Sequence, residues 1–481
     1  MKGIIIILLF LAYPAFCQTI YQSHEVEKVA EPNGGAGLLN QFLVSNVQVP
    51  FKSTIRGVKG KVYVKGIVET DGTITGLEIV RGIDSLCNSE AIRVLALYKS
   101  WQPALLKNQK VRQSIVYPVT FIAPPRQGFD STQSNLIGYY NDQYITENNV
   151  AAYKYRSVMP VNEDGNIKGD ILFEELKNKN WKQIFTVPFQ RTELWYKVSD
   201  EPGIDSVNCY QLSAQDDVRQ IHYVPVSTFQ TNGKLLAYTE YGAQGKPTLK
   251  KDYYLSGVLK EMKVFGDSSS TDIRYYANGQ IKSIVENPVN AIEHTNEKNI
   301  INTWDADGRQ YVKDGNGWGK LVKKQYTGQI LVEEGQVASG VRDGKWTGKK
   351  ADSTLFYEEI YEKGILKEGV AFVNGEKVNY QEKIRQPNFK GGEKAFYSFI
   401  GQNIKYPPNA ARDGIKGRVF LSFVVCEDGS LCDYKILKGV RSDLDREALR
   451  VVQKMSGKWE AGELRGQKVR VKYNLPINFQ F

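Results

Sequence analysis

Residues that could support catalysis or hold a metal ion are few and far apart in this sequence. The three histidines, His24, His222 and His294, lack the H-E-x-x-H or H-x-x-E-H spacing that places two imidazoles on one ion. The sequence has no G-x-S-x-G elbow, no P-loop and no dinucleotide-binding G-x-G-x-x-G after a strand. We therefore expect no enzyme activity, no metal site and no small-molecule cofactor.

Adjacent carboxylates are the next candidates for chemistry, because two of them can form an acid-base couple. They occur at Glu333-Glu334 and Glu358-Glu359. We interpret both pairs as solvated charges near strand ends rather than as a catalytic couple.

The cysteines show no C-x-x-C spacing, so a structural zinc site has no support. Cys426 and Cys432 flank the turn Glu427-Asp428-Gly429-Ser430, while Cys87 and Cys209 stand alone. Two alternatives remain for the flanking pair: a cross-strand disulfide in an oxidising compartment, or two unpaired thiols in adjacent strands.

Length and composition indicate a multidomain chain that is rich in β structure. With 481 residues we expect three or four domains. The 43 Gly and 28 Tyr residues suit turn-rich sheets better than helix bundles. Lys and Arg exceed Asp and Glu by 63 to 53, but the excess is diffuse, so we expect no nucleic-acid binding.

The first 17 residues have the pattern of a secretory signal. Lys2 precedes the apolar run Ile4–Ala12, Pro14 interrupts it, and Ala15-Phe16-Cys17 places small residues at −3 and −1 before Gln18. The run is too short for an ordinary membrane span, which needs about 20 residues. We expect cleavage after Cys17 and export to the periplasm; the alternative is an uncleaved inner-membrane anchor.

The sequence carries one module twice. Gly60-Lys61-Val62 recurs 357 positions later as Gly417-Arg418-Val419, and the same offset relates Asp71-Gly72 to Asp428-Gly429. After one inserted residue, Trp101 matches Trp459. An ordered series of matches with a single insertion indicates a duplication.

Each copy reads as a helix packed on a small antiparallel sheet. In the second copy, Gly417–Cys426 and Leu431–Leu437 form a hairpin around Asp428-Gly429. An amphipathic helix follows over Arg446–Met455, and Val469–Phe481 is the last strand. Pro476 interrupts that strand, which indicates a sheet edge or a bulge.

Two residue types recur at matching positions of the copies. Trp101 and Trp459 follow the helix, where core filling is favoured over ligand stacking. Arg93 and Arg450 lie on the helix, where an intramolecular salt bridge or a solvated face is favoured over pairing with a partner's carboxylate.

Both copies resemble the TonB C-terminal domain family. The second copy shows Tyr406-Pro407, Asp428-Gly429, Glu447-Ala448-Leu449-Arg450, Trp459 and Pro476-Ile477-Asn478-Phe479, and the first has Val49 before Pro50 in place of the Tyr. The resemblance implies a protein-binding domain that pairs strands with a segment of an outer-membrane transporter. Energy-transducing members keep a membrane helix and a Pro-rich spacer, and neither is evident here.

The resemblance places the candidate partner-binding edge on the last strand, Val469–Phe479, or on its counterpart Val111–Phe121. The alternative is that this strand lies in mid-sheet and only builds the core. The candidate site residues, taken at alternating positions of the last strand, are Val469, Val471, Tyr473, Leu475, Ile477 and Phe479.

The middle of the chain contains a looser repeat in which an aromatic residue is followed by a glycine and a short apolar run. Examples are Tyr254-Leu255-Ser256-Gly257-Val258-Leu259 and Tyr276-Ala277-Asn278-Gly279-Gln280-Ile281. This period predicts stacked β-hairpins and resembles MORN-type repeats. Two alternatives remain: a platform that contacts proteins, or a spacer between the end modules.

These observations give a fold and a function hypothesis. We expect α+β terminal modules flanking an all-β hairpin-repeat region, with a signal at 1–17, modules at 32–124 and 386–481, a β-rich lead-in at 136–228 and repeats at 229–380. The hypothesis is a periplasmic TonB-like adaptor associated with transmembrane transport. Its partner would be an outer-membrane transporter or another envelope protein, with self-association through sheet edges as a further mode. The rivals are a structural or immunity-like envelope protein that binds through its repeats, and a hydrolase within 136–228.

Overall fold

The computed structural model describes residues 19–122, 128–198, 203–216, 221–242, 245–288, 299–324 and 330–480. The expected signal segment therefore lies outside the described residues. The chain divides into two compact units, Met1–Asn290 with Ile300–Lys313, and Ala291–Asn299 with Asp314–Phe481.

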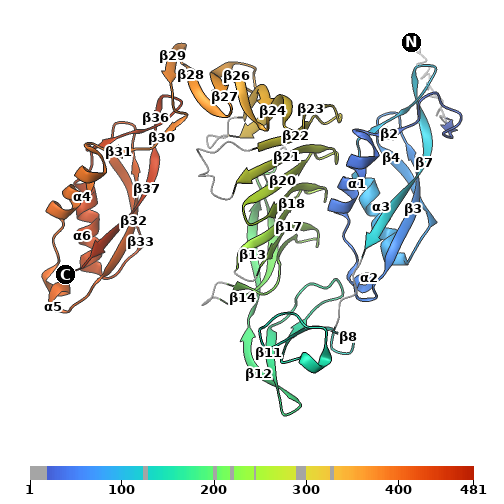
Figure 1. Cartoon of the computed structure of the whole chain (residues 1–481), viewed down its shortest axis with the longest axis horizontal. Helices are drawn as coiled ribbons and strands as arrows, with labels where there is room; N and C mark the ends of the chain where they lie inside the picture. The colour runs from blue at the N-terminus through green and yellow to red at the C-terminus, as the bar shows by residue number, and fades with distance from the viewer. Residues whose placement is uncertain are drawn as a thin grey trace, which may run out of the picture. The chain divides into compact units, whose positions relative to one another are not determined.

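The first module of the first unit is a helix layer on a sheet that is antiparallel except for β1, which runs parallel to β7, as Figure 1 shows in blue. The sheet order is β1-β7-β3-β4, with β6 also paired to β7, and β2 pairs β5. The helices are α1 (Gly35–Asn46), α2 (Phe51–Ile55) and α3 (Ser85–Leu97). The strands are β1 (Ile20–Tyr21), β2 (Glu31–Pro32), β3 (Lys59–Val68), β4 (Ile74–Arg81), β5 (Trp101–Gln102), β6 (Ala104–Leu106) and β7 (Gln109–Ile122).

A separate five-stranded sheet follows, in the order β12-β11-β10-β9-β8. Its members are β8 (Phe129–Asp130), β9 (Asn135–Tyr140), β10 (Tyr155–Pro160), β11 (Ile171–Lys177) and β12 (Asn180–Val187), with the 3-10 helix η1 (Val150–Ala152) between β9 and β10.

The rest of the first unit is a run of neighbouring, mostly antiparallel strands. Gly257 and Gly279 have φ of 92° and 87°, so these positions need the left-handed conformation that glycine adopts without strain. The strands are β13 (Phe189–Lys197), β14 (Ser206–Asp216), β15 (Ile221–His222), β16 (Val226–Gln230), β17 (Leu235–Tyr241), β18 (Pro247–Tyr253), β19 (Leu259–Phe265), β20 (Ser269–Tyr275), β21 (Ile281–Pro288), β22 (Asn299–Trp304) and β23 (Gln310–Lys313).

The first module packs on these strands through α1. Phe42 and Leu39 are buried in one core with Tyr275, Leu259 and other residues of the hairpin strands. The Asn46 side chain accepts a 2.7 Å hydrogen bond from the buried Leu259 N–H, and the Tyr275 hydroxyl donates to Ser45 Oγ at 3.1 Å. The interface thus combines apolar burial with satisfied polar groups.

The second unit begins with six more antiparallel strands. Aromatic rings fill the space above glycines of neighbouring strands: a Cβ at Gly348 would lie 2.1 Å from the Tyr357 ring, and one at Gly335 2.5 Å from that of Trp346. The strands are β24 (Asn316–Lys324), β25 (Ile330–Ala338), β26 (Val341–Lys350), β27 (Leu355–Glu362), β28 (Ile365–Val373) and β29 (Glu376–Tyr380).

The second unit ends with the second α+β module, in which α4 and α6 lie on one face of the sheet β33-β32-β37 (Figure 1). Its helices are α4 (Gly392–Asn403), α5 (Pro408–Arg412) and α6 (Ser442–Gln453). Its strands are β30 (Ile384–Arg385), β31 (Asn388–Phe389), β32 (Gly417–Val425), β33 (Leu431–Lys438), β34 (Trp459–Glu460), β35 (Gly462–Leu464), β36 (Gln467–Val469) and β37 (Val471–Phe479). Among the residues described, the terminal modules are α+β and the hairpin region is built of strands.

Candidate partner-binding edge

Strand β37 lies at the edge of its sheet. It pairs with β32 over its whole length, from Gly417 opposite Phe479 to Val425 opposite Val471, without a shift in register. No other strand of the described chain pairs with its outer flank. An edge of this kind leaves backbone N–H and C=O groups available to an added strand.

Pro476 shows which backbone groups face that outer flank. It stands opposite Phe420, and because proline has no N–H, this must be a pair without hydrogen bonds between the two residues. Hydrogen-bonded and non-hydrogen-bonded pairs alternate along an antiparallel ladder, so Lys472, Asn474 and Asn478 also point their backbone groups outward. The edge therefore offers three N–H donors, with a gap at the proline.

The six candidate site residues have different surroundings. Val469 ends β36 and pairs with Gly462, so the expected strand is divided at Arg470 and β37 begins at Val471. Leu475, Ile477 and Phe479 are buried in the module's own core, whereas Val471 and Tyr473 are half-buried. A partner strand would thus meet the backbone of β37, because these side chains face inward.

The opposite edge, β33, is less suited to an added strand. The ladder between β32 and β33 has two irregularities, between Phe420 and Leu421 and between Ser422 and Val424. Asp433 in β33 has a positive φ of 53°. Bulges twist an edge strand and discourage pairing, so β37 is the regular edge of this module.

The corresponding strand of the first module, β7, is partly covered. It pairs with β3 along one flank, while β1 covers Arg112 and Gln113 on the other flank and β6 covers Gln109–Val111. Within the described chain, the outer flank of β7 has no strand partner from Ser114 onward. The first copy therefore offers a shorter equivalent edge.

The same polar network holds the helices in place in both copies. Arg450 pairs with Glu447 at 2.6 Å and donates to the Asn403 carbonyl at 2.6 Å; Arg93 does the same with Glu90 and Asn46, at 2.6 and 2.9 Å. Burial opposes ionisation of Glu447, but the hydrogen bond from Arg450 lowers its pKa. The intramolecular salt bridge predicted for the two arginines is confirmed.

The two tryptophans fill the cores of their modules, as predicted. Trp101 and Trp459 are 4% and 3% exposed. Trp459 packs edge-on against Phe389 and Phe423, with ring centroids 5.7 Å apart in each pair. These residues support the sheet from inside and are not accessible to a ligand.

A buried ion-pair cluster joins the second module to the hairpin strands of its own unit. The cluster consists of Glu333 on β25, Arg342 on β26, Glu359 on β27 and Arg465 in the turn between β35 and β36, and all four side chains are at most 5% exposed. Arg465 Nε donates to Glu359 at 2.8 Å, and Arg342 donates to Glu333 at 2.6 Å. Burial opposes ionisation of Glu359, but the charges of Arg465, Lys383 and Arg342 outweigh it and lower its pKa.

This cluster corrects the interpretation of the acidic pairs as solvated charges. Successive residues of a strand face opposite sides of the sheet, so one member of each pair faces inward. Glu333 and Glu359 are buried in mid-strand, while Glu334 pairs with Lys349 and Glu358 with Lys345 on the other face. Two arginines neutralise the buried pair, which gives it a structural role.

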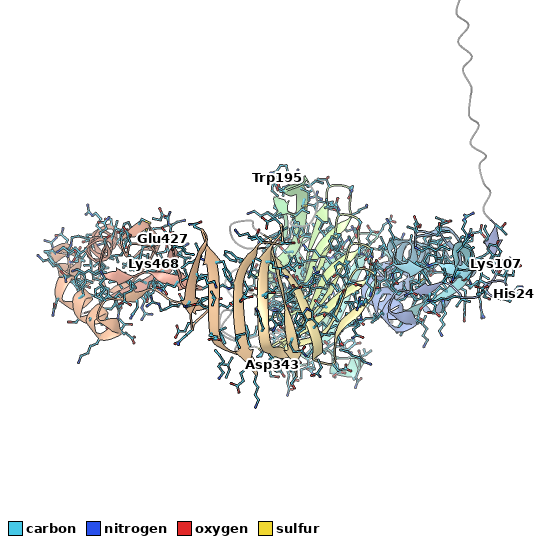
Figure 2. The ribbon with its side chains drawn as sticks, turned by 90° about the horizontal axis from the view of Figure 1, so that it is seen from above. His24, Lys107, Trp195, Asp343, Glu427 and Lys468 are labelled. Atoms are coloured by element: carbon cyan, nitrogen blue, oxygen red, sulfur yellow. The ribbon has the colours of Figure 1, made fainter. Side chains whose placement is uncertain are left out.

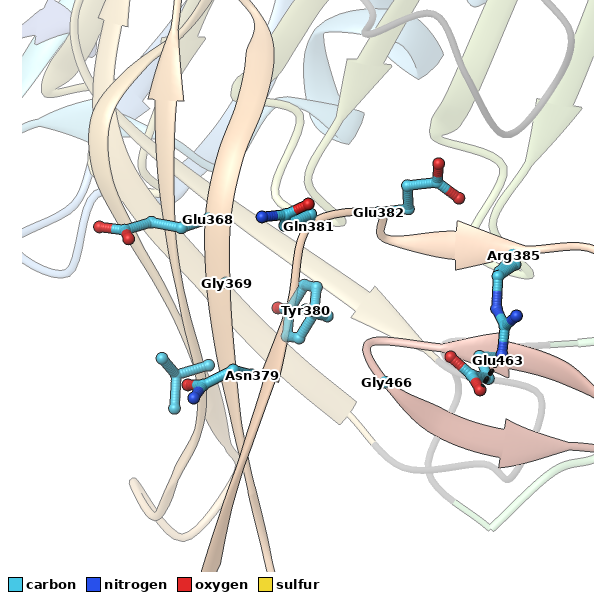
Figure 3. A pocket seen from close by; sticks show the side chains of 10 residues that line it. Glu368, Gly369, Asn379, Tyr380, Gln381, Glu382, Arg385, Glu463 and Gly466 are labelled. Atoms are coloured by element: carbon cyan, nitrogen blue, oxygen red, sulfur yellow. Dashed lines mark hydrogen bonds and ion pairs between the residues drawn. The ribbon is translucent and has the colours of Figure 1, made fainter.

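A polar cavity of about 760 Å³ lies beside the cluster (Figure 3). Tyr380 and Glu368 of the hairpin strands line it together with Gly466 of the module's turn. Arg385 and Glu463 form an ion pair across its wall, as the dashed line shows. Its lining contains no histidine, serine or cysteine.

Other candidate chemistry is dispersed. His222 stacks on Tyr241 with ring centroids 4.1 Å apart, and burial lowers its pKa; His24 is exposed, and His294 lies outside the described residues. Over residues 19–480, apart from the gaps given above, no group of three or more His, Cys, Asp or Glu side chains is arranged to hold a metal ion. In that same part of the chain, no helix has the length and apolarity needed to cross a membrane.

Fold and edge together define each terminal module as a small α+β domain that presents a strand edge. Residues 47–123 and 402–481 match the family model of the Gram-negative bacterial TonB protein C-terminal. Each terminal module is therefore similar to the TonB C-terminal domain over the matched residues.

Two proteins and two solved structures are similar to part of this chain. Protein TonB of Xanthomonas campestris pv. campestris strain B100 is 37% identical over 76 residues, which are 16% of this chain and 33% of that protein; the protein of strain ATCC 33913 gives the same values. The chain thus spans about a third of the length of these curated relatives. The NMR structure of Helicobacter pylori TonB-CTD (residues 179–285) is 26% identical with a TM-score of 0.15, covering 18% of this chain and 76% of that one. The form comprising residues 194–285 is 25% identical with a TM-score of 0.16, covering 18% and 90%.

Proposed function

We propose that this protein is a TonB-type adaptor of the Gram-negative cell envelope, which binds a segment of an outer-membrane transporter by adding it as a strand to β37. The single observation that carries the proposal is the outer flank of β37, which is regular and has no strand partner within the described chain. The two TonB C-terminal domain matches support the class of partner. The proposal assigns no catalytic step and no cofactor.

The backbone geometry sets the form of this interaction. Lys472, Asn474 and Asn478 would donate N–H groups to the added strand, which must itself be extended across about nine residues of β37. Their exposed polar side chains would flank the added strand on the solvent face. A second, shorter edge on β7 would raise avidity if the spacing of two segments allowed simultaneous binding.

The proposal places the protein in the periplasm after removal of Met1–Cys17. It is an adaptor, because a role in force transmission would require the membrane anchor that an uncleaved segment would supply. Sequencing the mature N-terminus separates these roles: Gln18 supports the released adaptor, and an intact Met1 supports the anchored form.

Site-specific photocrosslinking tests the edge directly in cells that make the protein. Benzoylphenylalanine replaces Asn474 on β37 in one variant and Lys435 on β33 in the matched control; both positions are exposed strand residues of the same module. We expect the Asn474 variant alone to crosslink to an outer-membrane transporter. Crosslinking from Lys435 alone, or from neither position in exported protein, would contradict the proposal.

A second candidate function is that of a structural or immunity-like envelope protein that binds its partner through the MORN-like hairpin repeats. One observation favours it: Trp318 on β24, which lies within the repeat region, is 50% exposed. Exposed tryptophans often anchor protein interfaces. A Trp318→Ala variant that loses a protein partner, in a protein whose Asn474 position crosslinks to no transporter, would support this candidate over the first.

A further inference from the structure

The cysteines that flank the turn between β32 and β33 lie unusually close together. Cys426 Sγ and Cys432 Sγ are 2.7 Å apart. A disulfide bond joins sulfurs at about 2.05 Å, so the two atoms need to approach by only about 0.7 Å. Both side chains are partly exposed, in contrast to Cys87 and Cys209, which are 0% exposed.

The backbone holds the two side chains in this position. Val424 pairs with Cys432 and Val425 with Leu431, and the Cys426 N–H donates to the Ser430 carbonyl at 2.9 Å. Within the turn, the Asp428 carboxylate accepts hydrogen bonds from the backbone N–H and the hydroxyl of Ser430, at 2.9 and 2.6 Å. Glu427 in this turn is labelled in Figure 2. Backbone pairing and the hydrogen bonds of Asp428 thus hold the β32–β33 hairpin in place without a contribution from the sulfur atoms.

The first module has a side-chain hydrogen bond at the place that corresponds to the two cysteines. The equivalent positions are Glu69 and Thr75, where Thr75 Oγ1 donates to Glu69 Oε1 at 2.5 Å. Arg112 completes that link through two hydrogen bonds to Glu69, at 2.6 and 2.8 Å. In the second module, Arg470 occupies the place of Arg112, donating to Cys432 Sγ at 3.2 Å and to Asp433 at 2.7 Å.

We propose that Cys426 and Cys432 form an intramolecular disulfide that staples the β32–β33 hairpin, replacing covalently the hydrogen-bonded link of the first module. The oxidant is a disulfide-bearing thiol reagent or protein. A thiolate of one cysteine attacks the oxidant's disulfide, forming a mixed disulfide and releasing one thiolate. The second cysteine's thiolate attacks the protein sulfur of that bond and releases the other. Two protein thiols are oxidised, one external disulfide is reduced to two thiols, and the two thiol protons pass to the released thiolates.

Peptide mapping of the full chain after incubation with oxidised glutathione tests this staple. Trypsin releases residues 419–435 as one peptide that contains both cysteines. We expect this peptide to resist alkylation and to be lighter by two hydrogens, while Cys87 and Cys209 remain alkylatable after denaturation. Alkylation of both Cys426 and Cys432, or linkage between chains in place of the internal bond, would overturn the proposal.

A stability measurement complements the mapping. We expect oxidation to raise the thermal midpoint of wild-type protein, and reduction with dithiothreitol to lower it again, because the staple restricts the unfolded hairpin. In Cys426→Ser, oxidised glutathione should instead leave a mixed disulfide on Cys432 and no upward shift of the midpoint. An equal upward shift in wild type and Cys426→Ser would overturn the assignment of the staple to this pair.

Discussion

Arg465 and Glu359, 106 positions apart in the sequence, form a 2.8 Å hydrogen-bonded ion pair with side chains that are 5% and 0% exposed. The pair fixes the turn between β35 and β36 of the second α+β module onto β27 of the hairpin strands. The same guanidinium stacks on the Tyr357 ring at 3.6 Å. This contact sets the attachment of the domain within its unit.

Replacing Arg465 by methionine should destabilise this attachment strongly. The substitution leaves the buried Glu359 and Glu333 carboxylates short of positive charge, at a cost of about 3–5 kcal/mol in the free energy of unfolding. Urea denaturation followed by fluorescence measures the change. Arg385→Met removes an ion pair that is 47% exposed on the arginine side, so it is the matched control, with an expected cost of about 0–1 kcal/mol. Equal effects of the two substitutions would refute the account.

The stabilising effect of Arg465 should depend on pH. The folded-state pKa of Glu359 lies below its ordinary value, so the ion pair contributes fully above the ordinary carboxyl pKa. Its contribution is lost as the pH falls through the lower folded value. We therefore expect the difference in unfolding free energy between wild type and Arg465→Met to shrink on acidification from neutral pH. A difference that stays constant or grows under acid conditions would show that Glu359 is not the titrating partner.

The duplication supplies a matched pair of variants for the interface of the first domain. Asn46 and Asn403 both donate to a carbonyl one helical turn earlier, at 2.9 and 2.8 Å, but only Asn46 also accepts from the N–H of Leu259, which is 0% exposed. Asn46→Ala should therefore destabilise the protein by about 1–3 kcal/mol more than Asn403→Ala. Thermal and urea unfolding of the two variants would test this difference, and equal stabilities would contradict it.

Proline substitution distinguishes the two flanks of β37. Asn474→Pro removes an outward N–H and should leave the ladder with β32 intact, while partner binding falls by about fivefold, since one hydrogen bond contributes about 1 kcal/mol. Tyr473→Pro removes an inward N–H and should destabilise the fold. Circular dichroism measures the effect on folding. Binding to the transporter that was identified by crosslinking measures the effect on the edge. Unfolding by Asn474→Pro with a stable Tyr473→Pro would reverse the assigned orientation.

Much of the terminal domains could be predicted from the sequence because their determinants are local. The Asp428-Gly429 turn, the apolar face of the helix around Ala448 and the edge signal of Pro476 each lie within a few residues of the element they specify. The duplication also predicted that Trp101 and Trp459 occupy equivalent positions in the two modules.

The parts that could not be predicted depend on contacts between distant segments. Nothing near Arg465 in the sequence indicates that it reaches Glu359, because that contact requires the order and register of the intervening strands. The burial of Glu333 and Glu359 could not be predicted for the same reason, because strand register decides which member of each acidic pair faces inward. The division of the last strand at Arg470 had no signal such as proline or glycine.

Amide hydrogen exchange with residue resolution tests the central claim most directly. The experiment compares the free protein with the complex that it forms with the transporter identified by crosslinking. We predict that the amides of Lys472, Asn474 and Asn478 gain protection in the complex, while those of Tyr473 and Leu475, already directed at β32, stay as they were. Protection confined to β33 or to the hairpin strands, with the three outward amides of β37 unchanged, would contradict the account.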